Sequence, residues 1–373
     1  MLRKFSVSGY KNFNEEMTLD LTQVKNYEFN RECITNGLLG KVLIMGPNGS
    51  GKSNLGYALF DIVYTLTDKP AHFVQDDVQS FINGEGNAKT AVFRYEFQQG
   101  GSVISYEYRK SSPRVLTYEK LSVDRKVVIE FDHTKNKIVS GDLSSVNGDK
   151  LRLDGRSGSL SIVRLIANNT SQKEGSPIVF MMDFINRMLY FKSTQDGNMF
   201  IGFERMGTDF VESYLIRNGL VDGLENFLKE NAELDIKLST TKVPGMQDVM
   251  VQKFRSKNIQ FTSIASSGTK ALELFYYWSR RFDRVSFLFI DEFDAFYHFE
   301  VAEKIIRLLM KYKDVQIVLT SHNTGIVSNS VMRPDCYLQI RNGKIRFLPE
   351  STDRELREGH NLEKMLRNGE FNE

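Results

Sequence analysis

The pattern of apolar and polar positions divides the first third of the chain into short strands and one helix. Leu2–Ser8 and Met17–Leu21 read as strands on either side of a polar turn. The compact apolar run Val42–Met45 predicts a strand that is buried on both faces. The segment after it, Asn54–Thr65, places leucine, isoleucine and valine at helical spacing and therefore predicts a helix.

The middle of the chain changes period twice. From Thr90 apolar residues alternate with polar ones, and the pair Gly100-Gly101 predicts the turn of a β-hairpin. Two more strands are predicted at Val115–Val123 and Lys126–Phe131. Residues 157–233 then read as mainly helical. The predicted helices cover residues 159–169, 176–191 and 209–230.

The last third alternates strands with helices, which is typical of an α/β sheet. A helix is predicted after Ser267, a strand at Val285–Ile290, a helix at Val301–Tyr312 and a strand at Val315–Thr320, before a hairpin at Asn342-Gly343. Short strands are expected near residues 236–238, 249–254 and 259–261. The predicted division is an N-terminal lobe (1–156), a helical insertion (157–233), a C-terminal lobe (234–349) and a charged C-terminal tail (350–373), which is read as a solvated surface helix or tail.

Composition narrows the class of protein. The 373 residues include 49 Lys+Arg and 47 Asp+Glu, so the net charge of +2 argues against a protein that coats nucleic acid through bulk charge. The only cysteines, Cys33 and Cys336, provide no disulfide framework, which favours a reducing compartment. No apolar run is long enough to span a bilayer, and the N-terminus lacks a secretory signal. We therefore expect a cytoplasmic protein without a membrane partner.

A glycine-rich loop follows the buried strand and precedes the first helix. It fits the pattern G-x-x-x-x-G-K-[ST] completely, and in this context it predicts a phosphate-binding loop rather than an accidental glycine-rich turn. Glycines let backbone N–H groups surround phosphate oxygens, Lys52 would reach the β- and γ-phosphates, and the Ser53 hydroxyl would bind Mg²⁺. The predicted nucleotide contacts are Gly46, Pro47, Asn48, Gly49, Ser50, Gly51, Lys52, Ser53 and Asn54.

Two carboxylates follow the apolar strand Val285–Ile290. Asp291 stands at the carboxyl end of this strand, where α/β sheets bind ligands, and would hold Mg²⁺ through water. Glu292 is placed to act as the general base that polarises an attacking water. The alternative is a pair of acidic caps at a strand end, and the phosphate-binding loop upstream disfavours it.

Two further sites are predicted from their position relative to these motifs. Ser267 and Gly268 open a helix within S-S-G-T-K and would form a second anion site, although such a turn on its own is commonly only a helix cap. His322 ends the strand Val315–Thr320 and could hydrogen-bond a γ-phosphate, whereas a lone histidine is more often structural.

These four motifs, in this order, resemble the ABC ATPase superfamily and its soluble SMC/RecF-like branch. A closer resemblance is to AAA-type ATPases of bacterial anti-phage systems: the OLD-family ATPase domain and the ATPases of Septu-, PARIS- and abortive-infection-type loci. The shared features are an S-S-G-T signature in place of L-S-G-G-Q, the run from Ile290 to His298 that reads I-D-E-x-D-x-x-x-H, and T-S-H-N at Thr320–Asn323.

The resemblance implies an α/β ABC-type ATPase head with a P-loop sheet, an antiparallel β subdomain and a helical insertion. It implies ATP and Mg²⁺ as ligands, with Glu292 and His322 as catalytic residues. It also implies that two heads dimerise, so that Ser267 and Gly268 of one face the nucleotide of the other. The expected role is a sensor or scaffold that controls a separate effector protein, a nuclease or toxin, in response to a phage-derived trigger.

The lengths of two segments argue against two architectures found among related proteins. Only 51 residues follow His322, too few for the Toprim nuclease domain of OLD-family proteins. The 214 positions from Ser53 to Ser267 lack the sustained heptads of a long SMC coiled coil. We therefore expect no nuclease centre in this chain.

The sequence departs from the family pattern at two places. There is no convincing Q-loop among Gln75, Gln98 and Gln99, and Phe299 replaces the usual proline after the histidine of the acidic motif.

The main alternative function is that of a RecF-like DNA-repair ATPase that clamps DNA. It needs a basic stripe, but the cations of this chain are dispersed among acids. The nucleotide-binding subunit of a transporter is disfavoured by the signature.

Overall fold

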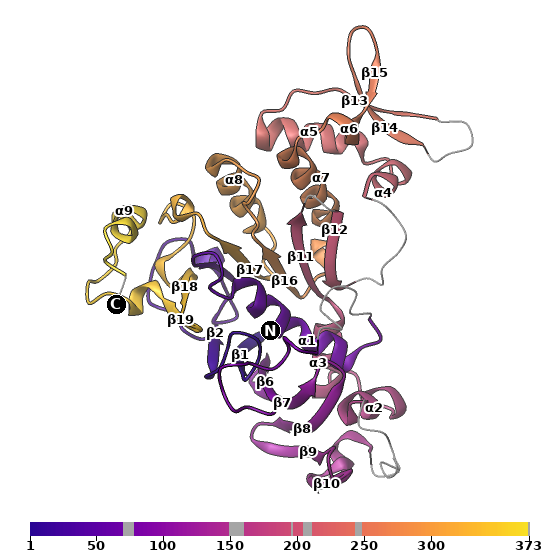
Figure 1. Ribbon diagram of the computed structural model, residues 1–373, viewed down its shortest axis with the longest axis vertical. Coiled ribbons are helices and arrows are strands. Elements are labelled where there is room, and N and C mark those ends of the chain that lie inside the picture. Colours follow the sequence, from indigo (N-terminus) through magenta and orange to yellow (C-terminus); the bar gives the residue numbers. More distant parts are fainter. Residues whose placement is uncertain (70–77, 149–159, 195–196, 204–210, 243–247, 372–373) are drawn as a thin grey trace.

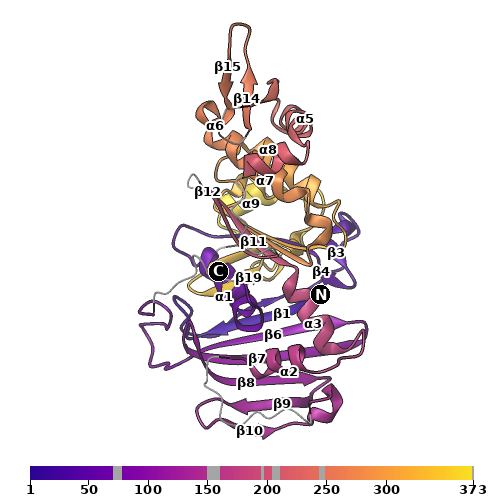
Figure 2. The ribbon, with the colours of Figure 1, turned by 90° about the vertical axis from the view of Figure 1, so that its right-hand side faces the viewer.

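The computed structural model describes residues 1–69, 78–148, 160–194, 197–203, 211–242 and 248–371. Two seven-stranded sheets form the body of the protein, and helix α1 (Lys52–Leu66) lies between them (Figures 1 and 2). None of the described helices is both long and apolar enough to cross a membrane. The observed α/β architecture confirms the predicted fold class.

The central sheet carries the predicted P-loop strand. Its strand order is β12-β11-β16-β17-β5-β18-β19, with parallel pairing from β11 through β18 and antiparallel edges. Helix α1 packs against β11 and β16, and α7 (Ser267–Ser279) and α8 (Phe299–Leu309) lie on the other side (Figure 2). Covered faces explain why β5, β16 and β17 are apolar runs without alternation. The strands are β5 (Lys41–Met45), β11 (Met188–Thr194), β12 (Gly197–Gly202), β16 (Phe287–Asp291), β17 (Gln316–Ser321), β18 (Tyr337–Arg341) and β19 (Lys344–Phe347).

The second sheet is antiparallel, with the order β10-β9-β8-β7-β6-β1-β2. Its inner face packs on α1, α2 (Ile162–Asn169) and α3 (Pro177–Asn186), so the alternate residues Phe93, Tyr95 and Phe97 are buried. The hairpin predicted at Gly100-Gly101 joins β6 to β7 as expected. The strands are β1 (Leu2–Ser8), β2 (Met17–Asp20), β6 (Ala91–Gln99), β7 (Ser102–Ser112), β8 (Val115–Val123), β9 (Lys126–Asp132) and β10 (Lys137–Ser140).

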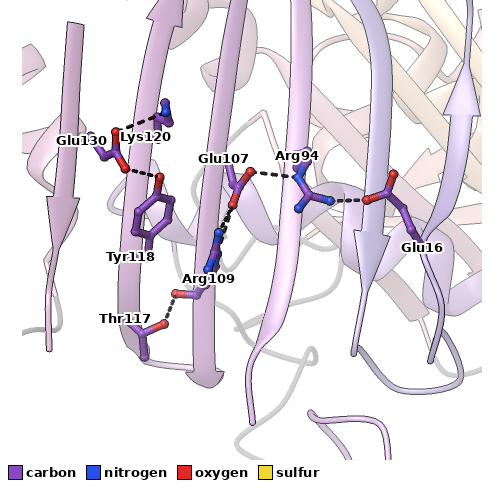
Figure 3. Close-up of polar contacts among 8 residues, drawn as sticks. All are labelled: Glu16, Arg94, Glu107, Arg109, Thr117, Tyr118, Lys120 and Glu130. Atoms are coloured by element: carbon purple, nitrogen blue, oxygen red, sulfur yellow. Dashed lines mark hydrogen bonds and ion pairs between the residues drawn. The ribbon is translucent and has the colours of Figure 1, made fainter. Parts of the chain in front are cut away.

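The outer face of this antiparallel sheet carries a ladder of charged side chains (Figure 3). Arg94 on β6 pairs with Glu16 and with Glu107 of the neighbouring strand. Further along, Tyr118 donates to Glu130, which also pairs with Lys120. Cations and acids alternate across the strands and balance one another on this face.

A small arm projects beyond α7 and α8 (Figures 1 and 2). Its three-stranded sheet, β13-β14-β15, contacts α4, α5 and α6, and α5 in turn packs against α7 and α8. The elements of the arm are α4 (Val211–Arg217), α5 (Val221–Ala232), β13 (Leu238–Thr241), β14 (Val249–Lys253), β15 (Asn258–Gln260) and α6 (Phe261–Ile264).

Short elements complete the chain. The charged C-terminal segment, predicted to be a solvated surface helix or tail, packs on the body through helix α9 (Leu362–Arg367), whose Leu362, Met365 and Leu366 are buried. Of the two predicted alternatives, the structure has the helix, and the apolar residues between its charges form one buried face of it. The other elements are β3 (Ile34–Thr35), β4 (Leu38–Leu39) and the 3₁₀ turns η1 (Arg31–Cys33), η2 (Leu143–Val146), η3 (Phe282–Arg284), η4 (Thr324–Ile326), η5 (Pro334–Cys336) and η6 (Leu348–Glu350).

The prediction that residues 176–191 form one helix was wrong. Helix α3 ends at Asn186, and Met188 begins strand β11, which pairs in parallel with β16 along its length. The apolar run after Arg187 suits a helix and a buried strand equally, and its neighbour in the sheet decides between them. Strand β12 also lies within the segment predicted to be helical. The domain boundaries themselves remain a prediction.

Candidate functional site

The phosphate-binding loop predicted from the sequence joins β5 to α1. Gly51 adopts a left-handed φ of 102° beside Asn12, and a Cβ at Gly46 would lie 2.7 Å from the Ile340 carbonyl oxygen. Both positions therefore require glycine. Asn54, in the first turn of α1, donates to the side chain of Asn12 at 2.7 Å and fixes the outer side of the loop.

Lys52 is the first residue of α1 and folds back over the loop. Its Nζ donates to the carbonyl oxygens of Gly46 at 2.7 Å and Pro47 at 3.0 Å. Burial lowers the pKa of Lys52, although the charges of Asp291 and Glu292 act in the opposite direction. Among the described residues, this ammonium donates to neutral carbonyls, so it can exchange them for the oxygens of an anion.

Asp291 is fully buried at the carboxyl end of β16. Its Oδ2 accepts a hydrogen bond from Ser53 Oγ at 2.6 Å, and its Oδ1 accepts one from Thr320 Oγ1 at 2.7 Å. The two residues predicted to hold Mg²⁺ therefore lie in contact, although 238 positions separate them in the sequence. A carboxylate beside a hydroxyl is an all-oxygen donor pair of the kind that Mg²⁺ prefers, so the residues present fit the ion.

Glu292 has an unusual backbone conformation. Its φ of 49° lies in the left-handed region, where a residue with a long side chain is strained, and its N–H donates to Thr320 Oγ1 at 2.8 Å. Strain of this kind is concentrated at functional sites. The side chain is about one-third exposed, so water can reach the carboxylate that is predicted to act as the base.

Strand β11 adds two residues that the sequence did not single out. Tyr190 donates its hydroxyl to Asp291 Oδ2 at 3.1 Å, and Lys192 Nζ lies 2.9 Å from Glu292 Oε2. Because residues 188–191 were predicted to be part of a helix, the sequence did not indicate that Tyr190 and Lys192 lie beside the acidic motif. Their spacing of two within an apolar run was the available signal, because residues i and i+2 of a strand point to the same side.

The predicted sensor His322 is exposed directly after β17. The preceding Ser321 donates to Asp294 Oδ2 at 2.8 Å, while the buried Oδ1 of Asp294 has no hydrogen-bond partner among the described residues. Burial raises the pKa of Asp294. Asp294 was not among the predicted site residues. The sequence carried a signal for it, since it stands three positions after Asp291 in the acidic motif.

The predicted second anion site, at the start of α7, is not next to the phosphate-binding loop of the same chain. Helix α7 begins beside α6, where the arm meets the body, and Ser266 caps it by accepting from Thr269 N–H at 3.2 Å (Figure 1). A Cβ at Gly268 would lie 2.8 Å from the carbonyl oxygen of Phe296, in the loop that follows β16. The assignment of Ser267 and Gly268 to nucleotide binding stays a prediction.

Two of the three candidates for a Q-loop glutamine, Gln98 and Gln99, lie away from this site. Gln98 and Gln99 end β6 beside the start of β1, whereas the phosphate-binding loop contacts Asn12, beyond the other end of β1. The Gln99 amide donates to the carbonyl of Gly175 at 2.7 Å. Gln75 lies outside the described residues, as does Gln195, the glutamine that follows β11 in the sequence. Phe299 begins α8 with its side chain half exposed.

A family model described as "AAA domain, putative AbiEii toxin, Type IV TA system" matches residues 42–328, which include the phosphate-binding loop, the acidic motif and His322. The chain belongs to this AAA-domain family. A comparison with curated protein sequences finds no match.

The solved structures that are similar to this chain include heads of SMC proteins. The SMC head domain from Thermotoga maritima is 14% identical with a TM-score of 0.43, over 92% of this chain and 97% of that one. An SmcHead bound to the C-winged helix domain of ScpA is 15% identical with a TM-score of 0.48, over 93% and 97%. An Smc head with an extended coiled coil, bound to the C-terminal domain of ScpA from Pyrococcus furiosus, is 14% identical with a TM-score of 0.46, over 92% and 95%.

Proposed function

We propose that this AAA-family protein is a Mg²⁺-dependent ATP hydrolase. The observation that carries the proposal is the contact between Ser53 and Asp291, which joins the phosphate-binding loop to the acidic motif at one sheet edge. Lys52 and Glu292 lie on either side of this contact, one to neutralise phosphate charge and the other to accept a proton. Ser53 and Asp291 would hold Mg²⁺, which neutralises the charge that develops on the phosphates when it is bound.

Each residue of this edge has a defined task in the proposed reaction. The backbone N–H groups at the start of α1 and the ammonium of Lys52 bind the phosphates and orient them. The hydroxyl of Thr320 fixes both the Asp291 carboxylate and the backbone of Glu292. Glu292 is then positioned to take a proton from the attacking water. His322, exposed beside this edge, is the proposed contact to the γ-phosphate.

The first test separates binding from hydrolysis. Lys52→Ala should weaken ATP binding by roughly a hundredfold, because a charged hydrogen-bond donor to phosphate is lost. Binding of a fluorescent ATP analogue measures this loss, and Lys229→Met, which removes an exposed lysine of α5 on the arm, is the matched control. Equal affinity of Lys52→Ala and the wild type would contradict the assignment of the loop.

The proposal extends to a pair of heads that share their sites. In a two-fold dimer, Ser267 of one head can face the nucleotide bound by the other. A mixture of Lys52→Ala and Ser267→Arg proteins should then regain one working site per mixed dimer, although each variant alone is inactive. A mixture that is no more active than the sum of its components would exclude shared sites.

We further propose that hydrolysis controls a separate effector in an anti-phage system. The family description, which names a toxin and a toxin–antitoxin system, supports a role of this kind. The projecting arm is the proposed docking surface for the effector or for a phage-derived trigger, and Phe254 and Ile264 on it are exposed. Phage plating on cells that carry the chain with its neighbouring genes tests the role. Protection that survives Glu292→Gln would contradict it.

One observation favours the alternative function of clamping DNA. The turn between β14 and β15 exposes Lys253, Arg255 and Lys257 beside Phe254, a combination that suits phosphates and a stacked base. Reversal of these three charges to glutamate should abolish a salt-dependent affinity for DNA if the alternative holds. Protein that binds no DNA at low salt, with or without ATP, would leave the effector role as the better account.

A further inference from the structure

Lys192 occupies a position for which the predicted motifs have no role. Strand β11 runs parallel to β16, and the register places Lys192 directly beside Asp291. Its Nζ lies 2.9 Å from Glu292 Oε2 and 3.8 Å from Asp291 Oδ2. The lysine side chain is about three-quarters buried at the mouth of the site. It therefore contacts both carboxylates of the acidic motif from the neighbouring strand.

The charges around Lys192 explain its position. Burial on its own would lower the pKa of Lys192, but the hydrogen bond to Glu292 and the charges of Glu292 and Asp291 raise it above its usual value. The other cation of the site, Lys52, is held by the carbonyl oxygens of the loop. Within the described part of the chain, Lys192 is therefore the lysine whose ammonium contacts both carboxylates.

The same contact orients the predicted base. The backbone of Glu292 is fixed by its N–H bond to Thr320 and by its left-handed conformation, which leaves the side-chain torsions to be set by contacts. The Glu292 carboxylate contacts the ammonium of Lys192. A carboxylate held in one orientation loses less conformational freedom when it takes up a water molecule for attack.

We propose that Lys192 is a positioning residue of the nucleotide site, which orients the Glu292 carboxylate and neutralises the Asp291–Glu292 pair in competition with a divalent cation. The inference rests on the proposed ATPase function for its kinetic consequence, but not for the competition. An ammonium and a divalent cation beside the same carboxylates repel each other. Lys192 therefore weakens metal binding to the nucleotide-free protein and keeps Glu292 in place.

The first experiment needs no catalysis. Mn²⁺ alone is titrated into the nucleotide-free full chain, and free Mn²⁺ is followed by its electron paramagnetic resonance signal. Lys192→Met should bind Mn²⁺ about tenfold more tightly than the wild type, which is the scale of one unit charge acting across about 4 Å at a partly screened site. Lys192→Arg, which keeps the charge, should bind like the wild type, as should the control Lys229→Met.

The second experiment separates orientation from binding. Lys192→Met should lower kcat for ATP hydrolysis by roughly tenfold to a hundredfold while KM for ATP stays within about twofold, and Lys192→Arg should restore most of kcat. A lysine that only stabilises the fold would not produce this split. Thermal melts of each variant show whether the protein is folded.

The outcomes of the two experiments are distinguishable. Equal Mn²⁺ affinity in the wild type and Lys192→Met, including no measurable binding in either, overturns the competition. Hydrolysis by Lys192→Met at the wild-type kcat overturns the positioning role. A wild type that hydrolyses no ATP contradicts the proposed function, and the Mn²⁺ titration then decides the role of Lys192 by itself.

Discussion

The outer face of the antiparallel sheet and the carboxyl edge of the central sheet use the same residue types in opposite ways. On the outer face, Arg94 lies between Glu16 and Glu107, and the side chains of Arg94 and Glu16 are about half exposed (Figure 3). At the central edge, Asp291 is fully buried and Glu292 has a strained backbone. Charges that alternate in water largely cancel, whereas charges brought together at strand ends and a helix start can act on a ligand.

A buried pair between the two sheets is intermediate. Lys110 on β7 and Asp61 on α1 lie 2.7 Å apart, both more than nine-tenths buried, and the Tyr108 hydroxyl also donates to Asp61 at 2.8 Å. This pair joins the helix of the phosphate-binding loop to the antiparallel sheet. The two charges are buried, as Asp291 is at the nucleotide site. Each is paired with an opposite charge, as the charges on the outer face are.

The same substitution in the two regions should give the largest contrast. Glu292→Gln should slow ATP hydrolysis by roughly a thousandfold while binding is retained, because an amide cannot accept the proton of the attacking water. Glu107→Gln, on the outer face, should hydrolyse ATP at the wild-type rate. Phosphate release under saturating ATP measures both rates. Glu292→Gln protein as active as the wild type would remove Glu292 from the mechanism.

The buried pair should matter for stability far more than the ladder. Lys110→Met leaves the Asp61 charge buried without its cation and should lower the free energy of unfolding by about 3–5 kcal/mol. Asp61→Asn in the same background should recover part of the loss, because the remaining side chain is neutral. Urea unfolding measures both. A change below about 1 kcal/mol for Lys110→Met would place this pair with the exposed ones.

Glu273 on α7 is a buried carboxyl group that belongs neither to the nucleotide site nor to the charged outer face. Burial, and secondarily the charge of Glu212, raises its pKa to about 8, and its Oε1 has no hydrogen-bond partner among the described residues. The folded protein therefore holds a proton that the unfolded chain releases above about pH 4.5, so stability should fall as pH rises from about 5 to 8. Glu273→Gln should remove on the order of 2–3 kcal/mol of this fall. Thermal melts at both pH values measure it, and identical slopes for variant and wild type would contradict the assignment.

The smallest effect is expected on the outer face itself. Arg94→Met breaks two ion pairs, but its side chain is 42% exposed, and exposed pairs contribute about 1 kcal/mol or less. Urea unfolding at low and at high salt should show a small loss that salt diminishes further. A loss as large as that of Lys110→Met would show that the two regions do not differ in the way argued above.

The sequence by itself determined the parts of this protein that depend on neighbouring residues. The strand Val42–Met45, the loop that ends in Lys52 and Ser53, and the strand before Asp291 are each local patterns. Their apolar runs, glycines and charges are sufficient to predict an α/β fold with a phosphate-binding loop. The hairpin at Asn342-Gly343 likewise follows from residues that favour the left-handed region, which both adopt.

Tertiary structure decided what depends on partners far away in the chain. Residues 188–191 suit a helix until β16 pairs with them, and this pairing brings Lys192 to Glu292, 100 positions later in the sequence. The pairing of Lys110 with Asp61 was likewise invisible in the pattern. Local propensity is similar for helix and strand in a short apolar run, so the free energy of long-range packing and pairing selects the structure.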